Sequence, residues 1–223
     1  MPRETTSVSR EDYLKAIWEF MQDGQVPISA RLAEELRVTP PAVTAALKRL
    51  ARDGLLHVHR DGHIRLTRKG RSAAAHLELR HQLAEKLLTD VIGLHWTRAH
   101  DAAERLEHGI SPEVEALLLR RFGADSSCPH GLPLRGGLAR LRRARGAVPL
   151  AEVPAGRTIE ILCVYEKDPK FLQFLDGRDL RPGARVRVLR REYDETTTVS
   201  ISGRKVYLGK PATSRIWGRD ISK

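Results

Sequence analysis

Residues 29–66 read SARLAEELRVTPPAVTAALKRLARDGLLHVHRDGHIRL, and they decide the fold of the N-terminal part of the chain. Two helical patterns lie in this stretch, and Thr39 followed by two prolines marks the start of the second. Gly54 ends that helix, and residues 55–66 form two short alternating runs around a turn, as in a β-hairpin. An apolar helical stripe over residues 9–24 comes before them. The order helix, helix, turn, helix, hairpin is that of a winged helix-turn-helix domain.

Such a domain places its third helix in the major groove of DNA and its hairpin near the backbone. The residues expected to face DNA lie on the outward side of that helix and in the hairpin: Thr39, Pro41, Ala42, Thr44, Ala45, Lys48, Arg49 and Arg60. Only Lys48 and Arg49 give the helix long charged donors, so we expect readout to depend partly on DNA shape. The formal net charge of +11 favours a polyanionic partner, although a generally basic composition would give the same charge.

Histidine and glutamate residues gather between positions 81 and 108. His81 and Glu85 are four residues apart, and a second set falls within roughly 100° of one face if the segment is a helix. That second set consists of His100, Glu104, Glu107 and His108. Nitrogen and carboxylate donors without a thiolate favour Mn²⁺ or Fe²⁺ over a structural zinc site. Alone, His81 and Glu85 would be read as a surface pair, and the second set favours a metal site.

The remaining patterns divide the chain. Helical patterns with aliphatic faces continue to residue 122, which is more apolar surface than a small winged-helix domain can cover, so we expect self-association. An Arg- and Gly-rich stretch follows, and after Pro154 short alternating runs with one helical insert indicate a small β domain. We predict a mainly α chain with a small β domain, in four segments: a winged helix-turn-helix at 1–70, a helical metal-binding and dimerisation domain at 71–133, a linker at 134–153 and a β domain at 154–223.

Other features exclude some classes of protein. Cys128 and Cys163 are too few for a disulfide framework, and no stretch is long and apolar enough for a signal or a membrane span. We therefore expect a cytoplasmic protein without a membrane partner. Cys128-Pro129-His130 is interpreted as a turn, and Glu166 and Asp168 as a solvated acidic loop.

These motifs together resemble the diphtheria toxin repressor family of metal-dependent bacterial transcriptional repressors. The resemblance spans residues 9 to about 133 and is carried by Asp12-Tyr13-Leu14, Thr39-Pro40-Pro41-Ala42-Val43-Thr44, His81-x-x-Ala84-Glu85-x-x-Leu88 and His100-Asp101-x-x-Glu104-x-x-Glu107-His108. The β domain is similar, more weakly, to the family's C-terminal SH3-like barrel. The resemblance implies a homodimer that binds a palindromic operator in double-stranded DNA when metal is bound.

The family has two neighbouring metal sites in each subunit. Carried over residue by residue, the primary site is Asp12, Glu104, Glu107 and His108, and the second site is His81, Glu85 and His100. Asp12 and Glu104 stand where iron-type members have Met and Cys, so the resemblance implies a manganese-type primary site. Lys15 stands at a position that is acidic in some manganese-type members, and Ala45 at one where iron-type members carry Gln, so the resemblance by itself establishes neither full occupancy by two manganese ions nor the iron-type operator. For Asp12, a capping box with Ser9 is an equal structural alternative.

The leading hypothesis is a repressor that binds Mn²⁺ or Fe²⁺ and controls metal-uptake genes, with no catalytic residues and no small-molecule substrate. One alternative is a metalloenzyme, since carboxylates and histidines around a metal can activate water. Another is a metal-independent winged-helix regulator whose His/Glu set is only an ion-paired surface.

Overall fold

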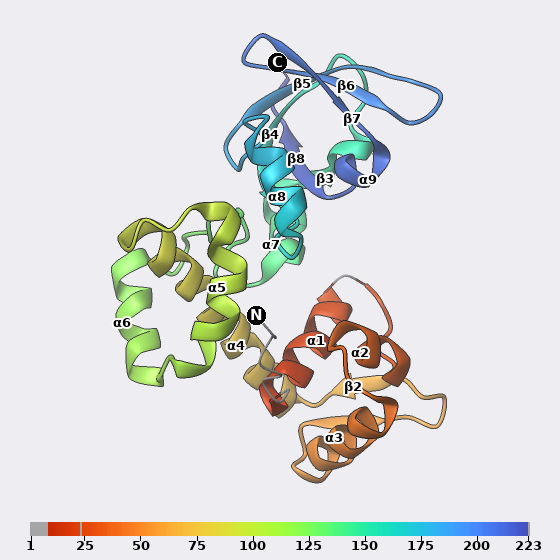
Figure 1. Cartoon of the computed structure of the whole chain (residues 1–223), viewed down its shortest axis with the longest axis vertical. Helices are drawn as coiled ribbons and strands as arrows, with labels where there is room; N and C mark the ends of the chain where they lie inside the picture. The colour runs from red at the N-terminus through yellow and green to blue at the C-terminus, as the bar shows by residue number, and fades with distance from the viewer. Residues whose placement is uncertain (1–8, 23, 223) are drawn as a thin grey trace, which may run out of the picture. The chain divides into compact units, whose positions relative to one another are not determined.

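The computed structural model describes residues 9–22 and 24–222, which belong to two compact units (Figure 1). The first unit is Met1–Leu79 and the second is Arg80–Lys223. Residues 1–8 of the predicted first domain lie outside the described residues. None of the described helices is long and apolar enough to cross a membrane.

The first unit is the predicted winged helix-turn-helix. Its elements are α1 (Arg10–Gln22), α2 (Ser29–Glu35), α3 (Pro40–Arg52), β1 (Leu56–Val58), β2 (Ile64–Leu66) and the first part of α4 (Arg68–Lys86). The strands pair antiparallel, with Leu56 opposite Leu66. Ile17 of α1, Leu32 of α2 and Leu50 of α3 are fully buried in one core, which fixes the three helices against the hairpin.

Side chains near two helix starts satisfy backbone groups that the helix leaves unpaired. The Ser9 backbone N–H donates to Asp12 Oδ2 at 2.6 Å, and the Asp12 N–H donates to Ser9 Oγ at 3.2 Å. This confirms the predicted capping box. Thr67 likewise accepts the Gly70 N–H at 3.1 Å. Ser29 is the first residue of α2, and Ile28 occupies its N-cap position without a side-chain hydrogen bond.

The N-terminal part of the second unit is helical. After the end of α4 it contains η1 (Leu87–Val91), η2 (Trp96–Arg98), α5 (Ala99–Leu106), η3 (Glu107–Gly109) and α6 (Pro112–Phe122). The segment that carries His100, Glu104, Glu107 and His108 is therefore not one α-helix, because its last residues tighten into a 3-10 turn. The regular angular spacing expected for His100, Glu104, Glu107 and His108 was wrong for the last two, which lie beyond the α-helix.

The C-terminal part is a small antiparallel β structure. Its elements are β3 (Val148–Pro149), η4 (Leu150–Glu152), β4 (Thr158–Val164), α8 (Pro169–Asp176), β5 (Arg185–Arg191), β6 (Thr197–Ile201), β7 (Arg204–Leu208), α9 (Lys210–Thr213) and β8 (Ile216–Asp220). The strand order is β3-β8-β4-β5-β6-β7. Alternate residues such as Val186 and Val188 of β5 point into the core, and α8 adds Leu172 and Leu175.

The Arg- and Gly-rich stretch is not the solvated tether that we predicted. Residues Gly137–Arg145 form helix α7, and Val148 pairs with Gly218 of β8. Leu141 is buried against Leu162 in a small apolar cluster, which holds α7 on the β structure. The repeated arginines obscured Leu138 and Leu141, the two leucines through which the helix packs on the β structure.

Candidate metal centre

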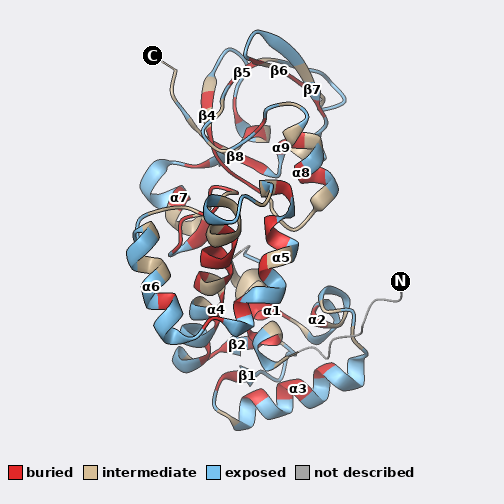
Figure 2. Ribbon diagram, turned by 60° about the vertical axis from the view of Figure 1, so that its left-hand side comes forward, coloured by how far each residue is buried: buried red, intermediate tan, exposed pale blue. Residues whose placement is uncertain are grey.

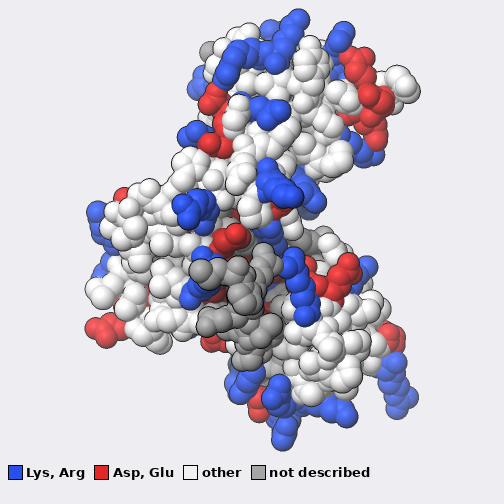
Figure 3. All heavy atoms as spheres, viewed as in Figure 1, with Lys and Arg blue, Asp and Glu red and all other residues white. Residues whose placement is uncertain are grey.

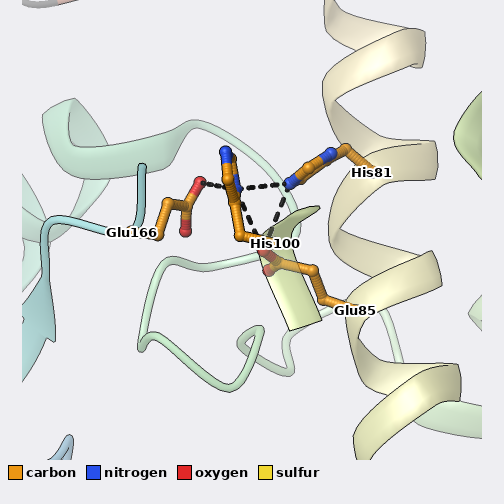
Figure 4. Close-up of side chains that lie close together, drawn as sticks. All are labelled: His81, Glu85, His100 and Glu166. Atoms are coloured by element: carbon orange, nitrogen blue, oxygen red, sulfur yellow. Dashed lines mark hydrogen bonds and ion pairs between the residues drawn. The ribbon is translucent and has the colours of Figure 1, made fainter. Parts of the chain in front are cut away.

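Donor side chains from four segments of the second unit meet in its interior. This buried cluster consists of His81, Glu85, His100, Cys128, His130 and Glu166. Figure 4 shows His81 and Glu85 on α4 facing His100 of α5 and Glu166, which follows β4. The three residues of the predicted second site are thus brought together, at 4% exposure or less.

Glu85 is the centre of this cluster. Its Oε1 lies 3.1 Å from His81 Nε2, 3.4 Å from His100 Nδ1 and 3.1 Å from His130 Nδ1. His81 Nε2 and His100 Nδ1 are themselves 2.9 Å apart. The second oxygen, Glu85 Oε2, is buried and has no hydrogen-bond partner among the described residues. An unpaired buried carboxylate oxygen is costly, and a bound cation would satisfy it.

Cys128 and His130 were interpreted as part of a turn, and the turn exists, but it carries its side chains into the cluster. Gly131 follows with a φ of +92°, and a Cβ there would lie 2.0 Å from the Leu162 carbonyl oxygen. Only glycine allows this approach to β4, where the Val164 N–H donates to the His130 carbonyl at 3.0 Å. The interpretation missed that this contact buries His130 completely.

The orientation of His130 follows from its other ring nitrogen. His130 Nε2 lies 3.0 Å from the Trp96 carbonyl oxygen, which can only accept a hydrogen bond, so Nε2 carries a proton and donates. Nδ1 then faces Glu85 and Glu166 and makes no well-aligned hydrogen bond. A histidine held in this way is a typical metal ligand with its outer partner in place.

The predicted solvated acidic loop divides into two residues with different roles. The Glu166 side chain is only 14% exposed and lies 3.8 Å from His100 and 3.4 Å from His130, so that prediction was wrong for Glu166. Asp168 caps α8, accepting from the Lys170 and Phe171 backbone N–H groups at 3.1 Å, and it is paired with Arg215. Glu166 is therefore available as a ligand, and Asp168 serves the helix.

Burial and mutual charge set the ionisation of the cluster. Burial opposes ionisation of Glu85, yet the charges of His130 and His81 hold its pKa well below its usual range. For His130, burial is likewise outweighed by Glu85, which raises its pKa. Burial, together with Glu85 and Glu166, raises the pKa of the Cys128 thiol well above its usual range. Without metal the cluster is an ion-pair network, and a cation must displace protons to bind.

The predicted primary set is distributed between the two units. Asp12 belongs to the first unit, whereas Glu104, Glu107 and His108 belong to the second. Glu107 is buried, and its Oε2 lies 2.5 Å from His81 Nδ1. Its Oε1 lies 3.7 Å from His108 Nε2, and the Glu104 side chain is 55% exposed. Glu107 thus touches both predicted sites, a link that the sequence did not indicate.

Comparisons with known proteins agree with this arrangement. A family model described as the iron dependent repressor N-terminal DNA binding domain matches residues 5–64. A second, described as its metal binding and dimerisation domain, matches residues 67–134, and a FeoA domain model matches residues 148–220. The diphtheria toxin repressor of Corynebacterium diphtheriae is 36% identical over 209 residues, covering 89% of this chain and 91% of that protein. The chain belongs to the iron-dependent repressor family.

Two further proteins are similar to this chain, one in sequence and one in structure. The iron-dependent repressor IdeR of Mycobacterium tuberculosis H37Rv is 39% identical over 158 residues, covering 68% of this chain and 69% of that protein. A solved structure of a manganese-dependent transcriptional repressor in complex with manganese superposes with a TM-score of 0.84 at 32% identity, covering 96% of this chain and 100% of that one. The chain is a metal-dependent DNA-binding transcriptional repressor of the Fe²⁺/Mn²⁺ class, not an enzyme, and its partners are DNA and a second copy of itself.

The buried cluster of this repressor fits a divalent cation. The donor atoms of His81, Glu85, His100 and Glu166 lie within 4.8 Å of one another, and so do those of Glu85, Cys128, His130 and Glu166. Ligands bonded to one ion at about 2.1 Å stand roughly 3–4 Å apart, so small side-chain shifts suffice. The orphaned oxygen of Glu85 is the observation that favours a cation over a closed ion-pair network.

In the first unit, the predicted DNA-facing residues of the repressor are accessible. Every one of them is exposed, whereas Val43, Leu47 and Leu50 of α3 point into the core. Figure 2 shows buried positions along one side of α3 and exposed positions along the other. Their contacts with DNA stay a prediction.

Proposed function

We propose that this repressor binds Mn²⁺ or Fe²⁺ at two sites and then binds a palindromic operator as a homodimer, which shuts off metal-uptake genes when metal is plentiful. The observation that carries the proposal is the buried cluster around Glu85. Three histidines lie within 3.4 Å of its Oε1, the Glu166 carboxylate is close by, and its Oε2 has no hydrogen-bond partner among the described residues. Such a donor set is chemically hard, apart from Cys128, and suits these two ions.

The second site in this proposal is wider than the sequence indicated. Its ligands come from His81, Glu85, His100 and Glu166, with Cys128 and His130 as a neighbouring set that shares both carboxylates. The bound ion supplies positive charge that neutralises Glu85 and Glu166 in the interior. The protein positions the donors through α4, α5 and the turn beside β4.

The first site consists of Asp12, Glu104, Glu107 and His108. Metal there would connect α1 of the DNA-binding unit with residues of the second unit. By linkage, metal favours the DNA-binding arrangement only through its higher affinity for that arrangement, and DNA must tighten metal binding by the same factor. We expect a coupling of about 1–3 kcal/mol, or roughly 5- to 150-fold in DNA affinity.

The exposed aliphatic residues of the helical part are the expected dimer surface. Val91 and Ile92 beyond α4, and Val114 and Leu117 of α6, are between 40% and 68% exposed. Apolar side chains at this exposure are typical of surfaces that a partner covers.

DNA affinity measured with and without metal tests the proposal. DNA fragments would be selected from the genome of the source organism with Mn²⁺-loaded protein, labelled and titrated with metal-free, Mn²⁺-loaded and Fe²⁺-loaded protein. Elemental analysis of the same samples gives the number of ions in each chain. We expect two ions in each chain and tighter binding of the loaded forms; equal DNA affinity in all three would contradict the proposal.

A further inference from the structure

The outer face of the β structure carries cations that have no partner among the residues that the structure describes. Because Val186 and Val188 point into the core, Arg185 and Arg187 of β5 point outward, and both are exposed. Arg187 is paired in register with Ser200 of β6, which is paired in turn with Lys205 of β7. These residues therefore share one face.

The β-face is the name used here for Arg185, Arg187, Lys205 and Tyr207. Tyr207 lies two residues beyond Lys205 on β7, so it points to the same side, and it is 61% exposed. Among residues 9–22 and 24–222, none of the four side chains makes a hydrogen bond or ion pair with another residue.

Neighbouring acidic residues do not neutralise the β-face, because each has a cation of its own. Glu160, opposite Arg185 in the register, is bound by Arg219 at 2.8 Å. Glu192 is paired with Arg190 at 2.7 Å, and Arg204 of β7 is paired with Asp179. In Figure 3 many blue side chains lie over the upper strands of this part, the largest group of red ones lies at its right edge, and a few red ones lie among the blue ones at its left side. The β-face is thus a local surplus of positive charge.

We propose that the β-face binds the phosphate backbone of double-stranded DNA, as a second, sequence-independent contact besides the winged helix. The chain is already a DNA-binding protein, so the polyanion is present in its functional complex. Arg185 and Arg187 are about 6.8 Å apart along their strand, a span of about two phosphates on one DNA strand. Arginine, lysine and tyrosine are all common donors to phosphate oxygens.

Three of the four side chains of the β-face are cationic, and Tyr207 is its one ring, so the β-face offers a protein partner little apolar surface. Its only large ring, Tyr207, carries a hydroxyl that donates to phosphate. Charged and hydroxyl side chains fit a backbone of repeated charges better than they fit an apolar partner. The contact has no base-reading element, so it adds affinity and salt dependence without specificity.

The test compares two variants of the full chain that lose the same charge. The β-face variant carries Arg185→Gln, Arg187→Gln and Lys205→Gln. The control variant carries Arg135→Gln, Arg142→Gln and Arg143→Gln, which are exposed and unpaired in the described chain and lie on or next to α7. In Figure 1, α7 lies at the end of the β structure away from β5, β6 and β7.

Affinity for a random-sequence DNA duplex is measured over a series of salt concentrations, with metal-free and with Mn²⁺-loaded protein. Each lost phosphate contact lowers the slope of log affinity against log salt by about 0.9, so the β-face variant should lose up to about 2.7 for each chain. The control variant should keep the slope of the wild type. Equal slopes for the wild type and the β-face variant would overturn the inference, and so would equal losses in both variants, because the effect would then be net charge alone.

This inference does not depend on the proposed metal sites. If metal fails to change DNA affinity while the β-face variant still loses slope, the proposed metal response is wrong and the β-face contact stands. If metal tightens DNA binding equally in the wild type and both variants, but the salt slopes of all three agree, the proposed metal response stands and the β-face contact is wrong. Unchanged thermal unfolding of both variants confirms that the exposed substitutions leave the fold intact.

Discussion

The buried cluster and the predicted primary set use similar side chains, yet they are built differently. All donors of the cluster belong to the second unit, and Glu85 is fully buried. The primary set takes Asp12 from the DNA-binding unit and its other members from the second unit. A site inside one unit can hold metal whatever the other unit does. Only a site whose ligands come from both units can bias how the units are arranged. Substitutions in the buried cluster should therefore change stability and metal affinity, and substitutions in the primary set should change the metal response of DNA binding.

The largest effect is expected for Glu85→Gln, because this carboxylate compensates the buried histidines. Removing one member of a buried ion pair costs about 3–5 kcal/mol, and we expect the low end because His130 can release its proton. The measurement is denaturant unfolding of the metal-free protein. The folded pKa of Glu85 is depressed, so its contribution is present above the unfolded pKa of about 4.3 and is lost as the pH falls through the folded pKa. The free energy of unfolding should therefore be lower in the variant than in the wild type at neutral pH, and the difference should disappear in acid. A deficit that stays constant with pH would contradict this account.

Asp12→Asn is expected to abolish the metal response of DNA binding while the fold remains. The amide oxygen still accepts the Ser9 N–H, so the capping box survives, but a neutral ligand binds Mn²⁺ poorly. DNA affinity should lose the roughly 5- to 150-fold gain on adding Mn²⁺. The measurement is DNA titration with and without metal.

Ser9→Ala is the matched control for Asp12→Asn. It removes the hydroxyl that accepts the Asp12 N–H and costs about 1 kcal/mol of helix stability. The Asp12 carboxylate is untouched, so the metal response should persist. If Ser9→Ala loses the response as fully as Asp12→Asn, Asp12 acts as a cap and not as a ligand.

Glu107→Gln tests whether the two sites are connected. Glu107 Oε2 is 2.5 Å from His81 Nδ1, while His81 Nε2 faces Glu85 and His100. A carboxylate behind a ligating imidazole raises its basicity, and losing such a partner typically costs about 10- to 100-fold in metal affinity. We expect that loss at the buried cluster, measured by direct Mn²⁺ titration. His108→Ala, which disables the primary set without touching His81, should leave the affinity of the cluster unchanged.

Much of the fold followed from local sequence patterns. Thr39-Pro40-Pro41 and Gly54 delimit α3 closely, and β4 (Thr158–Val164) begins shortly after Pro154, where the alternating runs start. These elements depend on caps, turns and alternation, which are local. Helix α7 was missed because one buried leucine among exposed arginines gives almost no periodic signal. The 3-10 turn at Glu107 was missed because Gly109, which ends the helix, is not one of the ligand residues whose spacing was counted.

The site divides in the same way. His81 and Glu85 have helical spacing, so their common face could be predicted from the sequence, whereas the place of His100 beside them was implied only by the family resemblance. Glu166 and His130 reach the cluster only through pairing and docking at β4, which spacing does not encode. A signal for His130 did exist in the sequence. Gly131 follows it, and a glycine in a short turn after a cysteine and a histidine can indicate that the turn packs closely against another segment, as it does here against Leu162.

The smallest change in affinity is expected for Cys128→Ser. Mn²⁺ prefers oxygen and nitrogen ligands, and burial raises the pKa of the Cys128 thiol, so thiolate binding costs a proton. We expect Mn²⁺ affinity to change by less than about tenfold, or 1.4 kcal/mol. Co²⁺ gains more from a thiolate, so the wild type loaded with Co²⁺ should show a sulfur-to-metal absorption band that Cys128→Ser abolishes. Cys163→Ala is the control, since Cys163 is also buried but stands outside both donor groups. If the band is absent from the wild type, or is lost in Cys163→Ala and kept in Cys128→Ser, Cys128 is not a ligand and the cluster binds metal through nitrogen and oxygen alone.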